Sequence, residues 1–286
     1  MTRAFLAFVL ATVFFATPVA AQNLSGTLKQ IKQSGEIRIG YRESEPPMSF
    51  LGKDGQPTGY SIDVCSRIVT VVKAKLNADI KVKFVPVTAE NRFKALTENK
   101  IDILCGSTTK TLSRRELVDF TELTFVTGAS LMTLKTSEVR DLAGLSGKKI
   151  GAVKDTTTVA VLNDLLKETL TDAKIVTVDS AGQGLDKLEK GEIDALSADQ
   201  VVLIGLASTA DDPTKFAIAS DVFSYEPFAL AVRRNDADFR LVADRAIAQL
   251  YGTGQILPIY EKWIGRFSKG RPALFDALFQ LNATPE

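Results

Sequence analysis

Hydrophobic and polar residues follow secondary-structure periods along most of the chain. After an apolar N-terminal run, the spacing predicts a short helix over residues 24–34 that stops at Gly35. Residues 36–41 alternate between polar and apolar side chains, as a half-buried strand does. Residues 44–57 are rich in Pro, Gly and other turn formers, so we expect a loop there.

A longer α/β unit follows this loop. The pattern predicts a helix over 60–76, a strand over 80–87, a helix over 91–99 and a short apolar strand over 101–104. The apolar stripe of the first helix consists of Ile62, Cys65, Ile68, Val69 and Val72. Strand, helix and strand in this order predict a parallel sheet.

An internal repeat indicates two similar lobes. The segment at 96–104 is similar in sequence to the segment at 188–196, and each places a leucine five residues before an Ile-Asp pair. A second echo pairs the strand and polar loop at 39–42 with those at 150–154. Two echoes in the same order predict two α/β lobes of the same kind.

Extending the repeat three residues beyond each strand pairs Ser107 with Asp199. In open α/β sheets, ligands bind outside the carboxyl ends of the strands. We therefore expect these two side chains to face one another across a cleft. The alternative is that Asp199 only caps a helix beginning near Gln200.

The C-terminal half contains two further features. Extended, β-rich runs at 125–134 and 228–233 lie where the chain must pass from one lobe to the other and back, which predicts a two-crossing hinge. Amphipathic helices over 237–251 and 256–264 follow, and we expect them to pack on the first lobe.

The N-terminus has the pattern of a secretory signal peptide. One cation at Arg3 precedes an apolar run over 4–16, and small residues at Val19 and Ala21 fit a cleavage site. The alternative, a membrane anchor, needs about 20 apolar residues, more than this run provides. We expect a secreted, periplasmic protein cleaved near Ala21.

Composition narrows the functional classes. The chain has 35 basic and 34 acidic residues, which argues against nucleic-acid or membrane partners. It contains no histidine, which removes the commonest general base and most zinc sites, so we expect no enzyme activity, cofactor or metal. Cys65 and Cys105 are either a disulfide or two buried thiols, and their separation does not decide between these.

Several motifs together resemble the family-3 periplasmic solute-binding proteins of amino-acid ABC transporters. They are Gly59-Tyr60-Ser61-Ile62-Asp63-Val64, Ile101-Asp102 and Gly106-Ser107-Thr108-Thr109, followed by Arg114 and Phe120-Thr121. The resemblance covers essentially the whole mature chain. It implies the two-lobed, type II periplasmic-binding-protein fold, in which each lobe is a mixed, mainly parallel sheet flanked by helices. It also implies a monomer that delivers an amino acid to a permease and ATPase complex in the inner membrane.

The implied division is a signal peptide at 1–21, lobe 1 at 22–128 and 229–286, and lobe 2 at 129–228. Within the family, the chain is most similar to the glutamate/aspartate-binding branch. The residues that carry this narrower similarity are Arg42-Glu43-Ser44, Asn91-Arg92, Cys105-Gly106-Ser107-Thr108-Thr109 and Thr156-Thr157.

The resemblance also implies a role for each site residue. Arg114 holds the ligand α-carboxylate, helped by Thr109, Thr156 and Thr157; Ser107 and Asp199 receive the α-ammonium group; Arg42 and Arg92 face the ligand side chain. A guanidinium fork suits a carboxylate because it makes two parallel charge-assisted hydrogen bonds. The alternative for Arg114 is a solvated ion pair with Glu116 or Asp119.

The chain departs from that branch at Ala89 and Ala181, where the branch has a serine and a histidine. Both changes enlarge the pocket and leave glutamine, asparagine or a larger acidic ligand possible. Two other functions fit the same scaffold. One is a cyclohexadienyl dehydratase-like enzyme, for which Glu43 is the only unassigned carboxylate near the motifs. The other is a sensor that presents its ligand to a membrane kinase or chemoreceptor.

Overall fold

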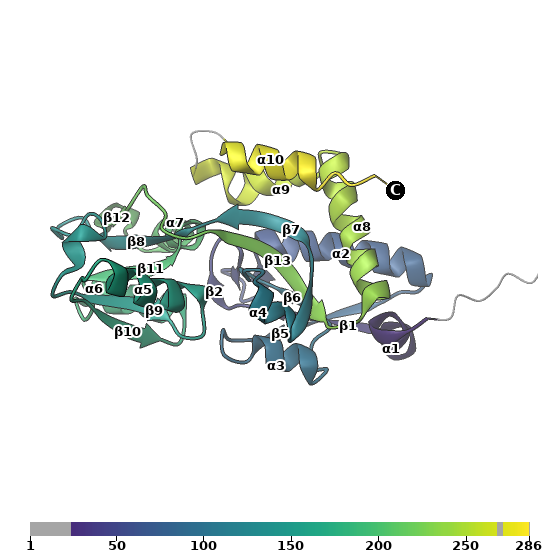
Figure 1. Ribbon diagram of the computed structural model, residues 1–286. Helices are drawn as coiled ribbons and strands as arrows, with labels where there is room; N and C mark the ends of the chain where they lie inside the picture. Colours follow the sequence, from purple (N-terminus) through teal and green to yellow (C-terminus); the bar gives the residue numbers. More distant parts are fainter. Residues whose placement is uncertain (1–23, 268–270, 286) are drawn as a thin grey trace, which may run out of the picture.

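The computed structural model describes residues 24–267 and 271–285. The predicted signal peptide and its cleavage site lie outside these residues. The described chain forms two lobes, each built on its own five-stranded sheet, with the two sheets joined end to end by long strands (Figure 1). None of the helices within these ranges is long and apolar enough to cross a membrane.

The first sheet has the strand order β5-β1-β6-β13-β7. Its strands are β1 (Glu36–Tyr41), β5 (Lys81–Pro86), β6 (Ile103–Cys105), β7 (Val118–Thr127) and β13 (Glu226–Arg233). The helices of this lobe are α1 (Gly26–Ser34), α2 (Tyr60–Leu76), α3 (Arg92–Thr97), α4 (Leu112–Arg115), α8 (Ala237–Gly252), α9 (Ile256–Trp263) and α10 (Ala273–Leu281). The predicted C-terminal helices do pack on this lobe, since α8 contacts α2 and β7 and α9 contacts α2.

The second sheet has the equivalent order β10-β9-β11-β8-β12. Its strands are β8 (Ala129–Leu134), β9 (Lys149–Val153), β10 (Lys174–Val178), β11 (Ala195–Asp199) and β12 (Phe216–Ile218). The helices of this lobe are α5 (Thr157–Glu168), α6 (Ala181–Glu189) and α7 (Gln200–Thr209). In each sheet the first three strands are parallel, the fourth is antiparallel and the fifth reverses again. The predicted mixed, mainly parallel sheets are confirmed.

The internal repeat has a physical cause in strand packing. In lobe 1, a Cβ on Gly40 would lie 2.4 Å from the Cδ1 atom of Ile101. In lobe 2, a Cβ on Gly151 would lie 2.4 Å from the Cδ1 atom of Ile193. Each isoleucine therefore packs directly over a glycine of the neighbouring strand. The aspartate after each isoleucine accepts a main-chain hydrogen bond at the start of that neighbouring strand, 2.8 Å long in both lobes.

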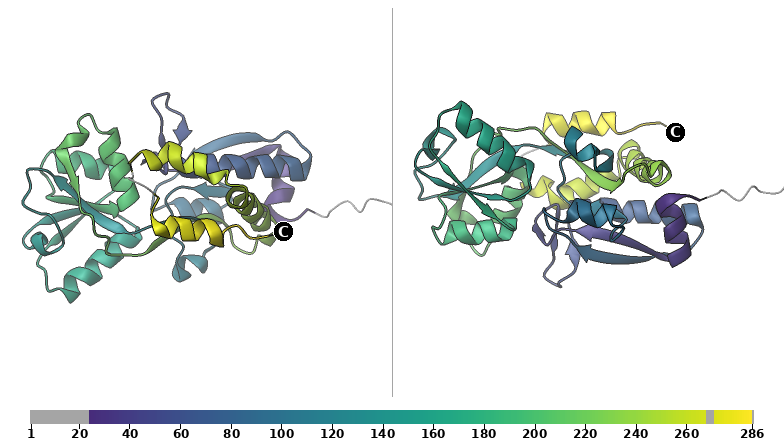
Figure 2. Two further views of the ribbon diagram at one scale, coloured as in Figure 1. Left: turned by 90° about the horizontal axis from the view of Figure 1, so that it is seen from above. Right: turned by 60° about the horizontal axis from the view of Figure 1, so that its bottom comes forward.

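The two crossings between the lobes lie side by side. The chain leaves the first sheet at Gly128, between β7 and β8, and returns over residues 219–225 before β13. A Cβ on Gly128 would lie 2.3 Å from the carbonyl oxygen of Ser224, and the Ala129 N–H donates to the Ser224 hydroxyl at 2.9 Å. Figure 2 shows the chain passing between the two lobes. The division into lobes that move stays a prediction.

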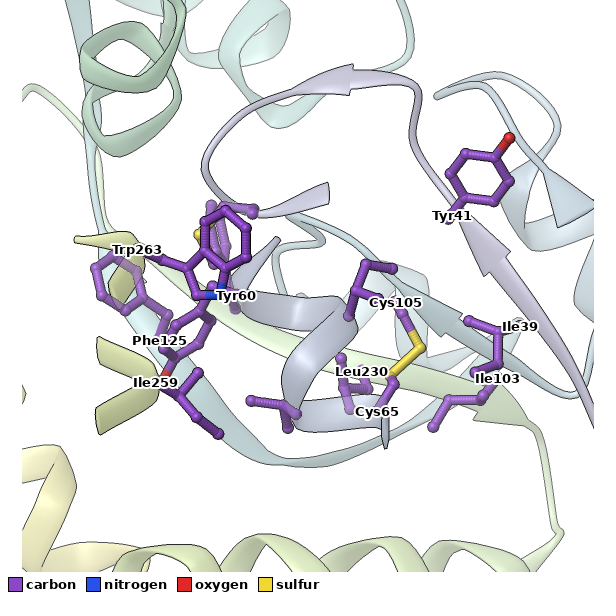
Figure 3. Packing of buried hydrophobic residues seen from close by; sticks show 14 of the residues in the cluster. Ile39, Tyr41, Tyr60, Cys65, Ile103, Cys105, Phe125, Leu230, Ile259 and Trp263 are labelled. Carbon is purple, nitrogen blue, oxygen red and sulfur yellow. A yellow bond between two sulfur atoms is a disulfide. The ribbon is translucent and has the colours of Figure 1, made fainter. Parts of the chain in front are cut away.

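Apolar side chains and one disulfide hold α2 against the first sheet. All five residues of the predicted α2 stripe are buried. A disulfide joins Cys65 on α2 to Cys105 at the end of β6 (Figure 3), which decides between the two alternatives that the sequence left open. The buried hydroxyls of Tyr60 and Tyr251 both donate to the Thr124 carbonyl, so α2 and α8 are tied to the same point on β7.

The local structure differs from the prediction in one segment and contains one helix that was not predicted. The loop expected over 44–57 contains three short strands, β2 (Ser44–Glu45), β3 (Ser49–Leu51) and β4 (Pro57–Thr58). Strands of two or three residues are too short to show a period in the sequence. No helix was predicted beyond residue 264, where the structure has α10; its Phe275 ring packs against Tyr260 with 4.2 Å between the ring centroids.

A polar contact also joins α9 to α2, and we expect it to contribute to stability. Asp63 accepts hydrogen bonds from the Trp263 indole N–H at 2.7 Å and from Lys262 at 2.8 Å. Asp63→Ala leaves the indole N–H without its partner, so we expect the free energy of unfolding to fall by about 1 kcal/mol. Urea unfolding measures this change. Asp164→Ala, on an exposed part of α5, is the control and should change stability by less than about 0.5 kcal/mol.

Candidate functional site

One cavity between the lobes brings together all eight side chains expected at the site. They are Arg42, Arg92, Ser107, Thr109, Arg114, Thr156, Thr157 and Asp199. The other residues of the wall are Glu45, Val153, Thr158, Ala181, Ser197, Ala198 and Val202. The cavity therefore contains charges of both signs together with several hydroxyl groups.

The fold places several of these residues at or just after the carboxyl ends of parallel strands. Arg42 follows β1, Ser107 and Thr109 follow β6, and Asp199 ends β11. The equivalent ends of β1 and β6 in lobe 1 and of β9 and β11 in lobe 2 point toward the boundary between the lobes. This is the position where open α/β sheets bind ligands.

The start of α5 offers free N–H groups to the cavity. Thr156 occupies the N-cap position but makes no capping hydrogen bond, because its hydroxyl donates to the Val153 carbonyl at 2.6 Å. The next hydroxyl, that of Thr157, donates to Glu226 at 2.8 Å. Uncapped N–H groups and the helix dipole favour an anion at this point.

Asp199 is not merely a helix cap. It occupies the N-cap position of α7, yet its side chain makes no capping hydrogen bond. Its Oδ1 atom is buried without a hydrogen-bond partner among the described residues. Burial, followed by the nearby Glu226 and Glu45 carboxylates, raises the pKa of Asp199 well above its ordinary value. A cation bound beside this carboxylate would supply the missing partner and lower that pKa.

Arg114 lies in the cavity wall and not in a solvated ion pair. Its Nη1 atom donates to the Thr109 carbonyl at 2.9 Å, and its guanidinium lies 5.5 Å from the Phe93 ring centroid. Asp119, one of the partners considered from the sequence, accepts instead from the Asn235 N–H at 3.0 Å. Burial lowers the pKa of Arg114, and Glu226 opposes that shift. The guanidinium is thus held in place by neutral contacts on one side.

Arg92 is a buried cation that lacks a full set of partners. It is 3% exposed, and its two terminal nitrogens donate to the carbonyls of Ala89 and Asp155. Its Nε atom has no hydrogen-bond partner among the described residues. Burial and then the neighbouring arginines lower the pKa of Arg92, although a guanidinium keeps its proton at neutral pH. An anion near Arg92 would therefore be stabilised.

Sequence reasoning missed two buried carboxylates. Glu45 pairs with Arg42 at 2.8 Å and accepts the Ser107 hydroxyl at 2.5 Å. Glu226 accepts the hydroxyls of Thr109 at 2.5 Å and Ser224 at 2.8 Å, besides that of Thr157. Glu45 lay in a predicted loop. Glu226 is the first residue of β13, and nothing in the neighbouring sequence indicated that its charge is buried or which groups it contacts.

Three other positions were discussed from the sequence: Ala181, Ala89 and Glu43. Ala181 lines the cavity, as the resemblance implies. Ala89 is buried and does not form part of the cavity wall. Its carbonyl accepts a hydrogen bond from the Arg92 guanidinium. Glu43 is exposed and lies outside the cavity wall. No group of three or more His, Cys, Asp or Glu side chains that could hold a metal occurs in residues 24–267 and 271–285.

Comparison with known proteins identifies the family to which this chain belongs. The chain is 33% identical to the L-glutamate/L-aspartate-binding protein of Pseudomonas aeruginosa, over 90% of this chain and 86% of that protein. It is 32% identical to the glutamate/aspartate import solute-binding protein of Escherichia coli K12, over 91% and 86%. Its fold matches a solute receptor for L-cysteine of Neisseria gonorrhoeae with a TM-score of 0.76 and 26% identity, over 87% and 98%. A model of the bacterial extracellular solute-binding proteins, family 3, matches residues 37–266, and this chain belongs to that family.

Proposed function

We propose that this protein is the periplasmic solute-binding subunit of an ABC importer and binds L-glutamate, L-aspartate or a related polar amino acid by hinge closure. Its relatives in Pseudomonas aeruginosa and Escherichia coli are glutamate/aspartate-binding proteins, not enzymes. Membership of a solute-binding family argues against the dehydratase-like alternative. A permease and ATPase are the partners of this function, and the protein acts as a monomer.

One observation carries the proposal: two buried polar atoms of opposite charge have no partner in the same cavity. They are the Nε atom of Arg92 in lobe 1 and the Oδ1 atom of Asp199 in lobe 2. Leaving such groups unpaired costs free energy. An acidic amino acid between the lobes has both of the charges that these groups require, an ammonium group for Asp199 and a side-chain carboxylate for Arg92.

The roles of the side chains follow from charge. Arg114 and the uncapped start of α5 hold the α-carboxylate, with Thr109 and Thr157 as hydroxyl neighbours. Asp199 holds the α-ammonium group, and the Ser107 oxygen is a second acceptor. The ligand side chain then points toward Arg42 and Arg92. All eight residues expected from the resemblance have a role in this arrangement.

Contacts between the lobes support closure around the ligand. Lys154 of lobe 2 pairs with Glu90 of lobe 1 at 2.8 Å, and Arg92 donates to the Asp155 carbonyl at 3.0 Å. A Cβ on Gly205 of α7 would lie 2.1 Å from the Pro46 carbonyl oxygen, so α7 also packs directly on lobe 1. Because the binding residues come from both lobes, only the closed form completes the site.

A thermal-shift screen across the twenty L-amino acids tests the proposed ligand class. We expect the largest increase in melting temperature with glutamate or aspartate. At a hundredfold excess over Kd, binding to the native state alone adds about 2.7 kcal/mol of stability. Shifts with basic or apolar amino acids alone would contradict the acidic or polar ligand. The absence of any shift, followed by no heat of binding in calorimetry, would contradict amino-acid binding itself.

Neighbouring permease and ATPase genes would separate an importer subunit from the sensor alternative.

A further inference from the structure

Glu45 is a buried carboxylate of the cavity wall that contacts both Arg42, expected to face the ligand side chain, and Ser107, expected to receive the α-ammonium group. The residue is 6% exposed, and the side chains of both Glu45 and Arg42 are 7% exposed. Its Oε1 atom lies 2.8 Å from Arg42, and its Oε2 atom accepts the Ser107 hydroxyl at 2.5 Å. Both carboxylate oxygens are therefore engaged with residues of the binding wall.

The neighbours of Glu45 hold this ion pair in place. A Cβ on Gly106 would lie 3.0 Å from the Cγ atom of Arg42 and 4.0 Å from Oε2 of Glu45, so the pair packs closely over this glycine. On the other side, the carbonyl of the next residue, Pro46, packs against Gly205 of α7. The Glu45–Arg42 pair is thus packed against lobe 1, and the main chain directly after Glu45 is packed against lobe 2.

The pair changes the charge that a ligand meets. Arg42 and Arg92 alone would present two positive charges to one side chain, which favours a carboxylate. Glu45 neutralises Arg42, so the three residues together carry one positive charge. The same glutamate accepts a hydrogen bond from the Ser107 hydroxyl, which leaves the lone pairs of the Ser107 oxygen free to accept a hydrogen bond.

We propose that Glu45 is a specificity-determining residue that weakens the preference of this site for a side-chain carboxylate over a side-chain carboxamide. This inference rests on the amino-acid binding proposed above. An amide fits the mixed wall because its oxygen accepts from a guanidinium and its NH2 group donates to Glu45. A second carboxylate gains the attraction of Arg92 but meets the repulsion of Glu45. The ligand class is therefore acidic amino acids together with their amides.

The test measures the ratio of two dissociation constants by calorimetry, Kd for L-glutamine divided by Kd for L-glutamate. Glu45→Gln keeps the size of the side chain and removes its charge, so the ratio should rise about tenfold in favour of glutamate. The matched control is Glu43→Gln, which removes the same charge from an exposed position two residues away. The control should leave the ratio within about twofold of the wild-type value.

A second variant gives an opposite expectation. Arg42→Gln retains Glu45 and removes its counter-charge, so the ratio should fall about tenfold. A purely structural role for the pair would weaken both ligands equally in both variants and leave the ratio unchanged, which would overturn the inference. If the wild-type protein binds neither ligand nor any other amino acid, the proposed function fails as well. An unchanged ratio in a protein that binds amino acids rejects the role of Glu45 alone.

Discussion

Replacing Arg114 with alanine should abolish the binding of every amino acid, whatever its side chain. The α-carboxylate is common to all amino acids, and Arg114 is the cation placed beside the uncapped start of α5 in the same cavity. Removing one partner of a buried, hydrogen-bonded charge pair costs about 2–5 kcal/mol of binding free energy. Most of that range corresponds to more than a hundredfold loss of affinity. Calorimetry with the amino acid that gives the largest thermal shift measures the effect.

The next residue provides a matched control for this change. Arg115 is an exposed arginine on the same short helix, α4, and Arg115→Ala removes an identical side chain outside the cavity. It should bind the ligand with wild-type affinity. Equal affinities for Arg114→Ala and the wild type would assign Arg114 a structural role and leave the α-carboxylate to the helix terminus.

Replacing Asp199 with asparagine should have two opposite effects, one on binding and one on stability. The ligand ammonium loses the buried carboxylate at the start of α7, so we expect affinity to fall by at least about a hundredfold. Without ligand, the closed arrangement of the lobes should become more stable at pH 7, because in it the variant no longer buries a carboxylate beside Glu45 and Glu226. A gain of about 1 kcal/mol in the free energy of unfolding is typical when a buried charge that only binding requires is removed.

The pH dependence fixes the sign of this stability effect. The pKa of Asp199 is raised in the folded protein, so the native state binds more protons than the unfolded state above the ordinary aspartate pKa. The contribution of Asp199 to stability is therefore fully present below that ordinary pKa and is lost as the pH rises toward the raised value. The advantage of Asp199→Asn should be absent near pH 3.5 and grow toward neutrality.

Thermal unfolding of the ligand-free proteins between pH 3.5 and 8 measures this trend. Asp186→Asn, on an exposed position of α6, is the control and should follow the wild-type curve. A variant at Asp199 that is less stable than the wild type at pH 7 would mean that the carboxylate stabilises the empty protein. The absence of capping hydrogen bonds from Asp199 would then need another explanation.

Much of the fold could be predicted because its signals are local or repeated. The strand over 36–41 and the helix over 60–76 have the predicted bounds, since alternation and a helical stripe are properties of consecutive residues. The repeat predicted the pairing of Ser107 with Asp199 because a glycine and an isoleucine pack in the same way in both sheets. Equivalent strands then end at the same cavity.

The parts that could not be predicted depend on contacts between distant segments. Glu226 reaches Thr109 across 117 positions of sequence, and no local pattern encodes that meeting. Glu45 occupies a strand of two residues, where neither alternation nor helical spacing can be recognised. These are the two carboxylates that change the charge of the site, so the sequence predicted the place of binding more completely than its selectivity.

Small-angle X-ray scattering with and without ligand tests most directly whether the protein closes around an amino acid. The ligand should be the amino acid with the largest thermal shift, at a concentration that calorimetry shows to be saturating. The residues that line the cavity are divided between two lobes joined by adjacent crossings at Gly128 and 219–225, so we expect a smaller radius of gyration when the cavity is occupied. The ligand-bound profile should match the closed arrangement described above. An unchanged radius, in a sample whose binding calorimetry has proved, would contradict hinge closure.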